Sequence, residues 1–476
     1  AGRLHEAIAL FEQNLDDHTR TLGPHHPDTL ISRDNLASAY REAGRLDEAI
    51  ALFEQNLEDS TRILGPHHPH TLTSRNNLAY AYHDAGRLHE AIALFEQTLE
   101  DSTRILGPHH PHTLTSRNNL AYAYREAGRL DEAIALFEQN LEDRTRILGP
   151  HHPDTLTAHL NLAYAYREAG RIDEAIALFE QNLEDRTRIL GPDHPDTLAS
   201  RHNLANAYRE MGRLDEAITL HQQNLEDSIH ILGPHHPHTL TSRHNLAVAY
   251  HDAGRLNEAI TLQEQNLKDF KNLLGPNHPH TLTSRHNLAN AYQAAGRLNE
   301  AIPLYEQTLK DFENLLGPHH PDTLTSRNNL AGAYRDAGRL DEAIPLYEQN
   351  LEDRTRILGP HHPHTLTSRH NLANAYQAAG RLDEAIPLYE QTLKDFENLL
   401  GPHHPLTLAS RHNLAGAYRD AGRLDEAVAL YEQTLEDRTR ILGPHHPHTL
   451  ISRNNLAIAY LAAGRSEEAK KLFGTP

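Results

Sequence analysis

The sequence predicts an all-helical solenoid, an elongated stack of helix pairs, and three observations lead to this prediction. The chain of 476 residues repeats itself with a period of 42, so that Ile63 to Tyr82 recurs unchanged at Ile105 to Tyr124. Most glycines and prolines recur at the same places in every repeat, where they punctuate the chain. Between them lie two segments with the apolar spacing of helices. Since neither helix of a pair buries its apolar side alone, successive pairs must stack.

The periodicity predicts one continuous domain over residues 1–476. The eleven repeats begin at residues 1, 43, 85, 127, 169, 211, 253, 295, 337, 379 and 421, and a partial repeat covers residues 463–476. The chain begins in the middle of a repeat, on a second helix. We therefore expect it to be a piece of a longer protein, with apolar surface at its first helix that permits end-to-end self-association.

The second repeat shows how the residues encode each helix. One helix is predicted over residues 46–64, because Gly65 permits a positive φ and Pro66 cannot continue a helix. The next helix should begin near Pro69, which has no N–H to leave unpaired, and stop at Gly86. The expected core residues are Leu46, Ala49, Ile50, Phe53, Leu57 and Leu64 in the first helix and Leu72, Leu78, Ala79 and Tyr82 in the second.

Composition restricts the possible functions. The formal charge is −20, from 65 acidic and 45 basic residues, and such a surface repels nucleic acid. The absence of cysteine excludes disulfides and cysteine nucleophiles and suits the cytoplasm. No apolar run reaches the length of a membrane span, so we expect no membrane association. No nucleophile, base and acid occur together in one copy only, so we expect no enzyme activity and no cofactor.

Histidines crowd the link between the two helices of a pair, as in His67, His68 and His70. A metal site needs several ligands held together, but only the middle histidine of the three occurs in every repeat. It precedes the proline that starts a helix, where a side chain can cap free N–H groups. We therefore predict that it is a helix cap and that the chain has no metal site. Adventitious nickel or zinc binding by the exposed pairs stays possible.

The segment Asn77 to Leu99, NLAYAYHDAGRLHEAIALFEQTL, resembles the tetratricopeptide repeat (TPR). The repeats are longer than the usual TPR and lack its tryptophan, and they are most similar to those of kinesin light chains, including the link LGPHHP. Similar arrays form the sensor arms of large bacterial signal-transducing ATPases, which implies a bacterial origin. The resemblance implies a right-handed α–α superhelix whose first helices line a concave, peptide-binding groove.

Three positions in the first helix of each pair vary most between repeats, and their spacing of four and then three residues places them on one helix face. They match the groove-facing positions of the TPR family. An aromatic and cationic stretch within them is formed by Tyr80, Tyr122, Tyr164, Arg125 and Arg167. We expect it to bind an apolar or acidic peptide segment, since aromatic and arginine side chains usually carry binding energy.

One asparagine next to these positions never varies. The eleven copies are Asn35, Asn77, Asn119, Asn161, Asn203, Asn245, Asn287, Asn329, Asn371, Asn413 and Asn455. In TPR proteins the matching asparagine often holds the backbone of a bound peptide, and an amide can donate and accept at once. The alternative is that it bonds to a neighbouring helix and supports the stack. A nearby arginine, such as Arg75, is expected to lie on a solvated face, paired with carboxylates.

The leading hypothesis is therefore a non-catalytic scaffold that binds a peptide or protein partner in its groove. A self-assembling structural solenoid and a sensor arm of a larger signal-transducing ATPase are the alternatives.

Overall fold

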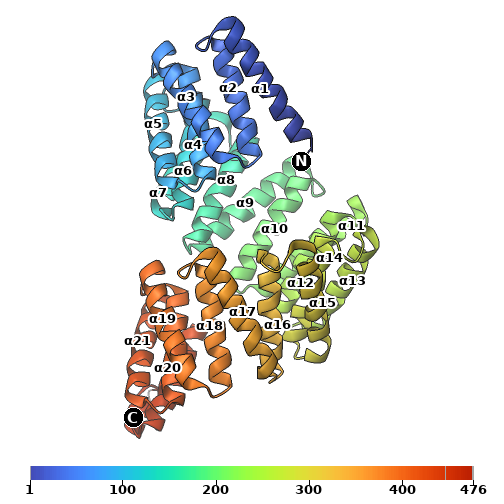
Figure 1. Cartoon of the computed structure of the whole chain (residues 1–476), viewed down its shortest axis with the longest axis vertical. Coiled ribbons are helices and arrows are strands. Elements are labelled where there is room, and N and C mark those ends of the chain that lie inside the picture. The colour runs from blue at the N-terminus through green and yellow to red at the C-terminus, as the bar shows by residue number, and fades with distance from the viewer. Residues whose placement is uncertain (1, 445, 474–476) are drawn as a thin grey trace. The chain divides into compact units, whose positions relative to one another are not determined.

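The structure, a computed structural model of the chain, describes residues 2–444 and 446–473. Within these residues it holds twenty-three α-helices and no strand, arranged as successive helix pairs (Figure 1), so the predicted all-helical repeat fold is confirmed. The helices group into two compact units, residues 1–233 and 234–476, and each is described by itself. No helix in the described ranges is both long and apolar enough to cross a membrane.

The first unit contains eleven helices. They are α1 (Gly2–Leu22), α2 (Pro27–Glu42), α3 (Leu46–Leu64), α4 (Pro69–Asp84), α5 (Leu88–Leu106), α6 (Pro111–Glu126), α7 (Leu130–Leu148), α8 (Pro153–Glu168), α9 (Ile172–Leu190), α10 (Pro195–Glu210) and α11 (Leu214–Leu232).

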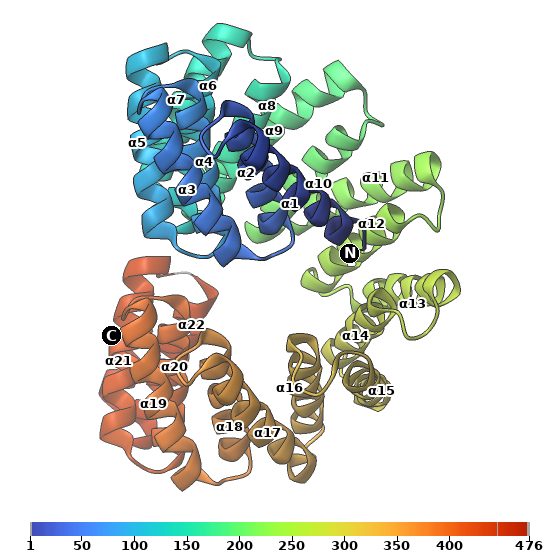
Figure 2. The same cartoon turned by 45° about the horizontal axis from the view of Figure 1, so that its top comes forward.

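The second unit continues the pattern and ends on a short helix. Its helices are α12 (Pro237–Asp252), α13 (Leu256–Leu274), α14 (Pro279–Ala294), α15 (Leu298–Leu316), α16 (Pro321–Asp336), α17 (Leu340–Leu358), α18 (Pro363–Ala378), α19 (Leu382–Leu400), α20 (Pro405–Asp420), α21 (Leu424–Leu442), α22 (Pro447–Ala462) and α23 (Ser466–Lys471). Within this unit each helix packs beside the next one in sequence, as Figure 2 shows for α12 to α22.

Helix ends follow the predicted punctuation. In the second repeat α3 ends at Gly65, whose φ of 92° is the left-handed region that glycine tolerates. The next helix begins at Pro69, and the side chain of His68 accepts a hydrogen bond from the backbone N–H of His70. The same cap occurs at the start of every even-numbered helix from α2 to α22. The prediction that the invariant histidine caps the helix is confirmed.

The core of each unit lies between its two layers of helices. Ala49, Ile50 and Phe53 of α3 and Leu78 and Ala79 of α4 are buried, as predicted. Four predicted core residues are only partly buried, namely Leu46, Leu57, Leu64 and Tyr82. Tyr82 turns its hydroxyl to Glu54 of the preceding helix, and the guanidinium of Arg87 lies 4.3 Å from its ring centre.

In nine places an arginine–aspartate ion pair, buried or partly buried, joins an even-numbered helix to the odd-numbered helix that follows it, and the sequence did not reveal its burial. Arg75 of α4 donates from Nη1 to Oδ2 of Asp101 in α5 at 2.7 Å, and from Nη2 to the carbonyl oxygen of Pro66 at 3.3 Å. Arg75 is 3 % exposed, so the expectation of a solvated face is wrong. The pairing of this arginine with a carboxylate was predicted correctly. Its exposure was not, because helix α5 packs over the ion pair and shields it from water.

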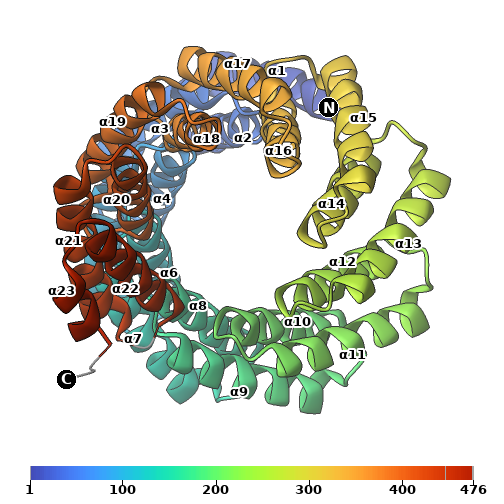
Figure 3. The same ribbon diagram turned by 90° about the horizontal axis from the view of Figure 1, so that it is seen from below.

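Helices alternate between two layers within each unit. In the view of Figure 3 the even-numbered helices form the inner layer of each unit's curve and the odd-numbered helices form the outer layer. The first helix of every repeated pair therefore faces inward, as the resemblance implied. The positions that vary between repeats lie on these inner helices.

Candidate functional site

Hollows recur between successive inner helices, and the variable positions line them. One hollow of about 270 Å³ lies between α4 and α6, over α5. Its walls include Tyr80 and His83 of α4 and Asn119 and Tyr122 of α6, and its floor includes Phe95 of α5. A second hollow of about 260 Å³ lies nearer the start of the same two inner helices. The inner face of the first unit is therefore hollowed between α4 and α6, beside the variable positions.

The three tyrosines of the aromatic stretch are half-buried and held by aromatic contacts. Tyr80, Tyr122 and Tyr164 each meet a phenylalanine of the outer layer edge to face, with ring centres 5.3 to 5.5 Å apart. Burial raises the pKa of all three hydroxyls, so they stay protonated at neutral pH. These contacts fix the rings in the wall of the groove before any ligand binds.

Arg125 and Arg167 lie over the tyrosine rings of their own helices. The guanidinium carbon of Arg125 is 4.8 Å from the ring centre of Tyr122, and that of Arg167 is 5.3 Å from that of Tyr164. Arg125 also pairs with Glu168 of the next inner helix at 3.4 Å. Its charge is thus already partly compensated, so an acidic ligand would compete with a carboxylate of the chain itself.

The eleven predicted asparagines lie one on each even-numbered helix from α2 to α22, and most of them link neighbouring inner helices. Asn119, for example, donates from Nδ2 to Oδ1 of Asn76 on the preceding inner helix at 3.0 Å. The same link joins Asn77 to Asp34, Asn161 to Asn118, Asn287 to His244, Asn329 to His286, Asn371 to Asn328, Asn413 to His370 and Asn455 to His412.

This amide ladder explains one of the three variable positions. Its residues are aspartate, asparagine or histidine wherever the ladder continues, because each of these side chains can accept a hydrogen bond. Leu160 is the exception and has no acceptor for Asn203. The stacking role of the asparagine is therefore a property of the fold. The nitrogen of Asn77 or Asn119 is used in the ladder, and the carbonyl oxygen takes no part in that bond.

Histidines of the links pair with the ion pairs described above. Nδ1 of His67 lies 3.4 Å from Oδ1 of Asp101, and Arg104 donates to the same oxygen at 2.6 Å. Eight repeats have this histidine–aspartate contact. In the part of the chain that the structure describes, no three histidine, aspartate or glutamate side chains are grouped to hold a metal ion.

Sequence reasoning missed a set of histidines packed between the helix layers. His286, His370 and His412 each meet a tyrosine ring of the next outer helix, with ring centres 5.1 to 5.5 Å apart. Burial lowers the pKa of each to about 4, so they are neutral at pH 7. A histidine followed nineteen positions later by a tyrosine was the signal that could have revealed these pairs.

A family model named tetratricopeptide repeat matches the chain in eleven overlapping stretches, at residues 1–58, 34–102, 75–142, 113–184, 155–226, 201–268, 239–314, 286–352, 322–398, 370–440 and 407–474. The chain belongs to the tetratricopeptide repeat family. A TPR array of this kind is a scaffold for protein–protein interaction, and such scaffolds are typically non-catalytic.

Solved structures of TPR proteins resemble parts of this array. Two crystal structures of nearly identical TPR-like repeats, from a Podosopora anserina protein described as a kinesin light chain, are 37% identical to it with a TM-score of 0.40. They cover 43% of this chain and 96% and 98% of their own. BtubC (BKLC) from P. vanneervenii is 20% identical, with a TM-score of 0.42, over 48% of this chain and 92% of its own. No curated protein matches the sequence.

Proposed function

We propose that the inner helices of this TPR array bind an extended peptide segment of a protein partner. The observation that carries the proposal is the row of hollows between inner helices, exemplified by the cavity of about 270 Å³ beside Tyr80 and Tyr122. These hollows are lined by residues that differ from repeat to repeat, on a backbone that hardly differs. Strong variation at three positions on one face of the inner helices favours recognition. A sensor arm of a larger signalling protein would use the face in this way.

The asparagines are proposed to hold the peptide backbone while they support the stack. The amide ladder uses the nitrogen of Asn77 or Asn119, which leaves the oxygen of the same amide to accept from a peptide N–H. Tyr122 and Arg125 would add an aromatic and cationic anchor beside this backbone contact. The overall charge of −20 argues against nucleic acid as the partner.

A peptide-display selection tests this proposal. The parent chain should enrich a linear motif, and a variant with Asn77 and Asn119 changed to Ala should lose it. Asn161 is left unchanged because its amide oxygen already accepts from the hydroxyl of Tyr122 at 2.6 Å. A second variant, Asp34→Ala, removes the ladder acceptor of Asn77 without changing a residue that lines either hollow, so it should still enrich the motif. Tyr122→Ala with Arg125→Ala should weaken the selected peptide at least tenfold, since anchors of this type contribute about 2 kcal/mol or more.

The matched pair of variants separates the two roles of the asparagine. If both variants lose the motif, the amides act only through the stack. If the parent itself enriches nothing, the inner face is not a linear-peptide site and the proposal is wrong.

A further inference from the structure

One repeat lacks the aromatic ring that the others place between the two helix layers. The residue at this position is Phe11, Phe53, Phe95, Phe137, Phe179, His221, Gln263, Tyr305, Tyr347, Tyr389 or Tyr431 in successive repeats. Ten of the eleven carry a ring, and Gln263 of α13 does not. The amide is smaller than a phenol ring, so this repeat has space that its neighbours fill.

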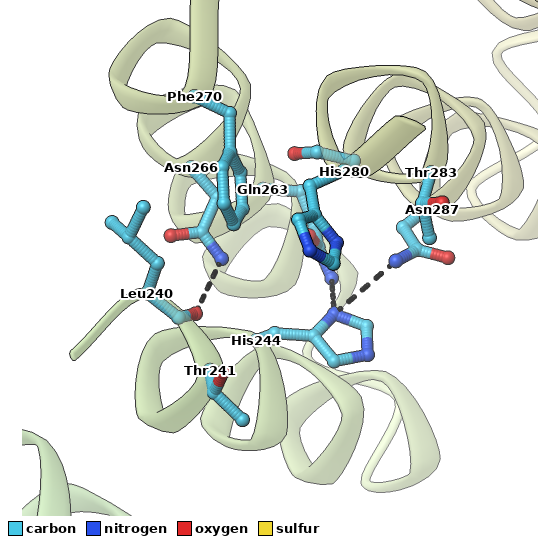
Figure 4. A pocket seen from close by; sticks show the side chains of 10 residues that line it. Leu240, Thr241, His244, Gln263, Asn266, Phe270, His280, Thr283 and Asn287 are labelled. Atoms are coloured by element: carbon cyan, nitrogen blue, oxygen red, sulfur yellow. Dashed lines mark hydrogen bonds between the residues drawn. The ribbon is translucent and has the colours of Figure 1, made fainter. Parts of the chain in front are cut away.

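Two adjoining cavities mark this space, inside the second unit. One of about 160 Å³ is lined by residues that include Leu240 and Phe270, and one of about 170 Å³ by residues that include Val248. Both share His244, Gln263 and a residue of the amide ladder, Asn287. Figure 4 shows these three side chains converging on one point from three helices. A cavity of about 150 Å³ is large enough for a benzene ring.

The polar end of Gln263 is incompletely bonded. Gln263 is 4 % exposed; its Nε2 lies 3.0 Å from Nδ1 of His244, and its Oε1 has no hydrogen-bond partner among the described residues. If the side-chain amide of Gln263 were flipped by 180°, its Oε1 would bond to His244 and its Nε2 would have no partner instead. Either way one end of a buried amide lacks a partner, which costs free energy that a ligand could recover.

The charges and the apolar wall define what the space would accept. No lysine, arginine, aspartate or glutamate is among the residues that line the two cavities, so a charged group would be left uncompensated. Alanine, valine, leucine and phenylalanine side chains supply contacts for a flat apolar body. A hydroxyl satisfies the amide in either orientation, because it both donates and accepts.

The next repeat shows such a group in place. The ring of Tyr305 meets His286 edge to face, at 5.5 Å between ring centres, and its hydroxyl bonds to Asn290 at 2.5 Å. Those residues correspond to Gln263, His244 and Val248 one repeat earlier. In one repeat the hydroxyphenyl group is the side chain of Tyr305. In the repeat before it, Gln263 takes that position and leaves the space of the ring unfilled.

We propose that the cavity between α12, α13 and α14 binds a neutral hydroxyaryl group, a planar ring with one hydroxyl, against Gln263 and His244. The group could belong to a free small phenol or to a tyrosine side chain of another polypeptide. Peptide binding elsewhere on the inner face is not required, because a small phenol tests the cavity by itself.

Titration of the full chain with p-cresol, followed by saturation-transfer NMR and calorimetry, tests the proposal. We expect saturable binding, with a dissociation constant on the order of 1 mM for so small a ligand. Gln263→Tyr restores the ring that Tyr305 represents and should weaken binding at least tenfold while circular dichroism stays unchanged. Gln263→Leu should keep the apolar space, and it should reduce the preference for p-cresol over toluene at least fivefold.

Gln265→Leu is the matched control, since it changes an exposed glutamine on the same helix and should leave binding within twofold of the parent. Binding of N-acetyltyrosinamide as tight as that of p-cresol would identify a tyrosine side chain as the natural group, and binding of p-cresol alone would identify a free phenol. The proposal is overturned if p-cresol does not bind the parent saturably, or if Gln263→Tyr leaves its affinity within twofold.

Discussion

At the scale of single residues, the buried histidines make the second unit sensitive to acid. His286, His370 and His412 are held neutral between the helix layers, and Nδ1 of each is buried without a hydrogen-bond partner in the described structure. At pH 7 these neutral side chains contribute ring packing and, through Nε2, the acceptors of the amide ladder. Protonation would place a positive charge where the surroundings cannot solvate it.

Acidification should therefore destabilise this unit through these three residues. Burial lowers the pKa of each to about 4, below the value of about 6.5 in an unfolded chain, so between these pH values the unfolded chain binds more protons. Stability is complete above about pH 6.5 and falls as the pH drops through this window, by up to about 3 kcal/mol per histidine at pH 4. Urea denaturation at pH 7.5 and pH 5 measures the loss.

The chain itself offers the control for this prediction. Asn76, Asn118 and Asn328 occupy the corresponding position in other repeats, so changing the three histidines to asparagine should preserve the amide ladder. The triple variant should lose clearly less stability between the two pH values than the parent. Equal losses in the two proteins would contradict the assignment of acid sensitivity to these histidines.

At the scale of helices, the buried arginine–aspartate pair joins an inner helix to the outer helix that follows it. Burial would raise the pKa of Asp101, but the hydrogen bond and charge of Arg75 outweigh it and hold the pKa below its usual value. The same contact spans twenty-six residues in nine repeats. His159 replaces the arginine in one repeat, where Arg188 and His151 still contact Asp185.

Removing this arginine should loosen one helix pair. Arg75→Met leaves the carboxylate of Asp101 buried with weaker partners, which should cost about 3 kcal/mol and speed amide exchange in α4 and α5 by about 100-fold. Arg104→Ala is the control, because its side chain is 58% exposed and its ion pair should contribute less than about 1 kcal/mol. Hydrogen exchange read out by mass spectrometry compares the two. Similar exchange in both variants would show that burial of the pair has no energetic consequence.

At the scale of the whole molecule, the contacts between helices are almost all local in sequence. Within each unit, every helix packs mainly against the helix before and the helix after it. Stability in such an array is approximately a sum of repeat and nearest-neighbour contributions. The cavity beside Gln263 lies entirely in the second unit, residues 234–476.

The second unit should therefore fold without the first. We expect residues 234–476 alone to give a helical circular dichroism spectrum and a cooperative thermal transition. If the hydroxyaryl proposal holds, this fragment should also bind p-cresol with the affinity of the full chain. An unfolded fragment would show that stability is not as local as the contacts indicate.

The helix boundaries and caps of this TPR protein were readable from the sequence. Gly65, Pro66, His68 and Pro69 act within a few residues of themselves, through φ angles, missing donors and a side-chain cap, so a single repeat contains all that is needed. Because the sequence repeats every 42 residues, the helix boundaries predicted for one repeat apply to the whole array.

Tertiary structure alone decided what those helices bury. Arg75 looked like a surface charge until its partner, twenty-six residues away, covered it, and the ladder acceptor of each asparagine lies forty-three residues earlier in the chain. The cavity at Gln263 exists because three helices approach one another where a ring is missing. Burial and hydrogen-bond partners depend on how the repeats pack against one another. The local residue pattern that determines a helix carries no information about that packing.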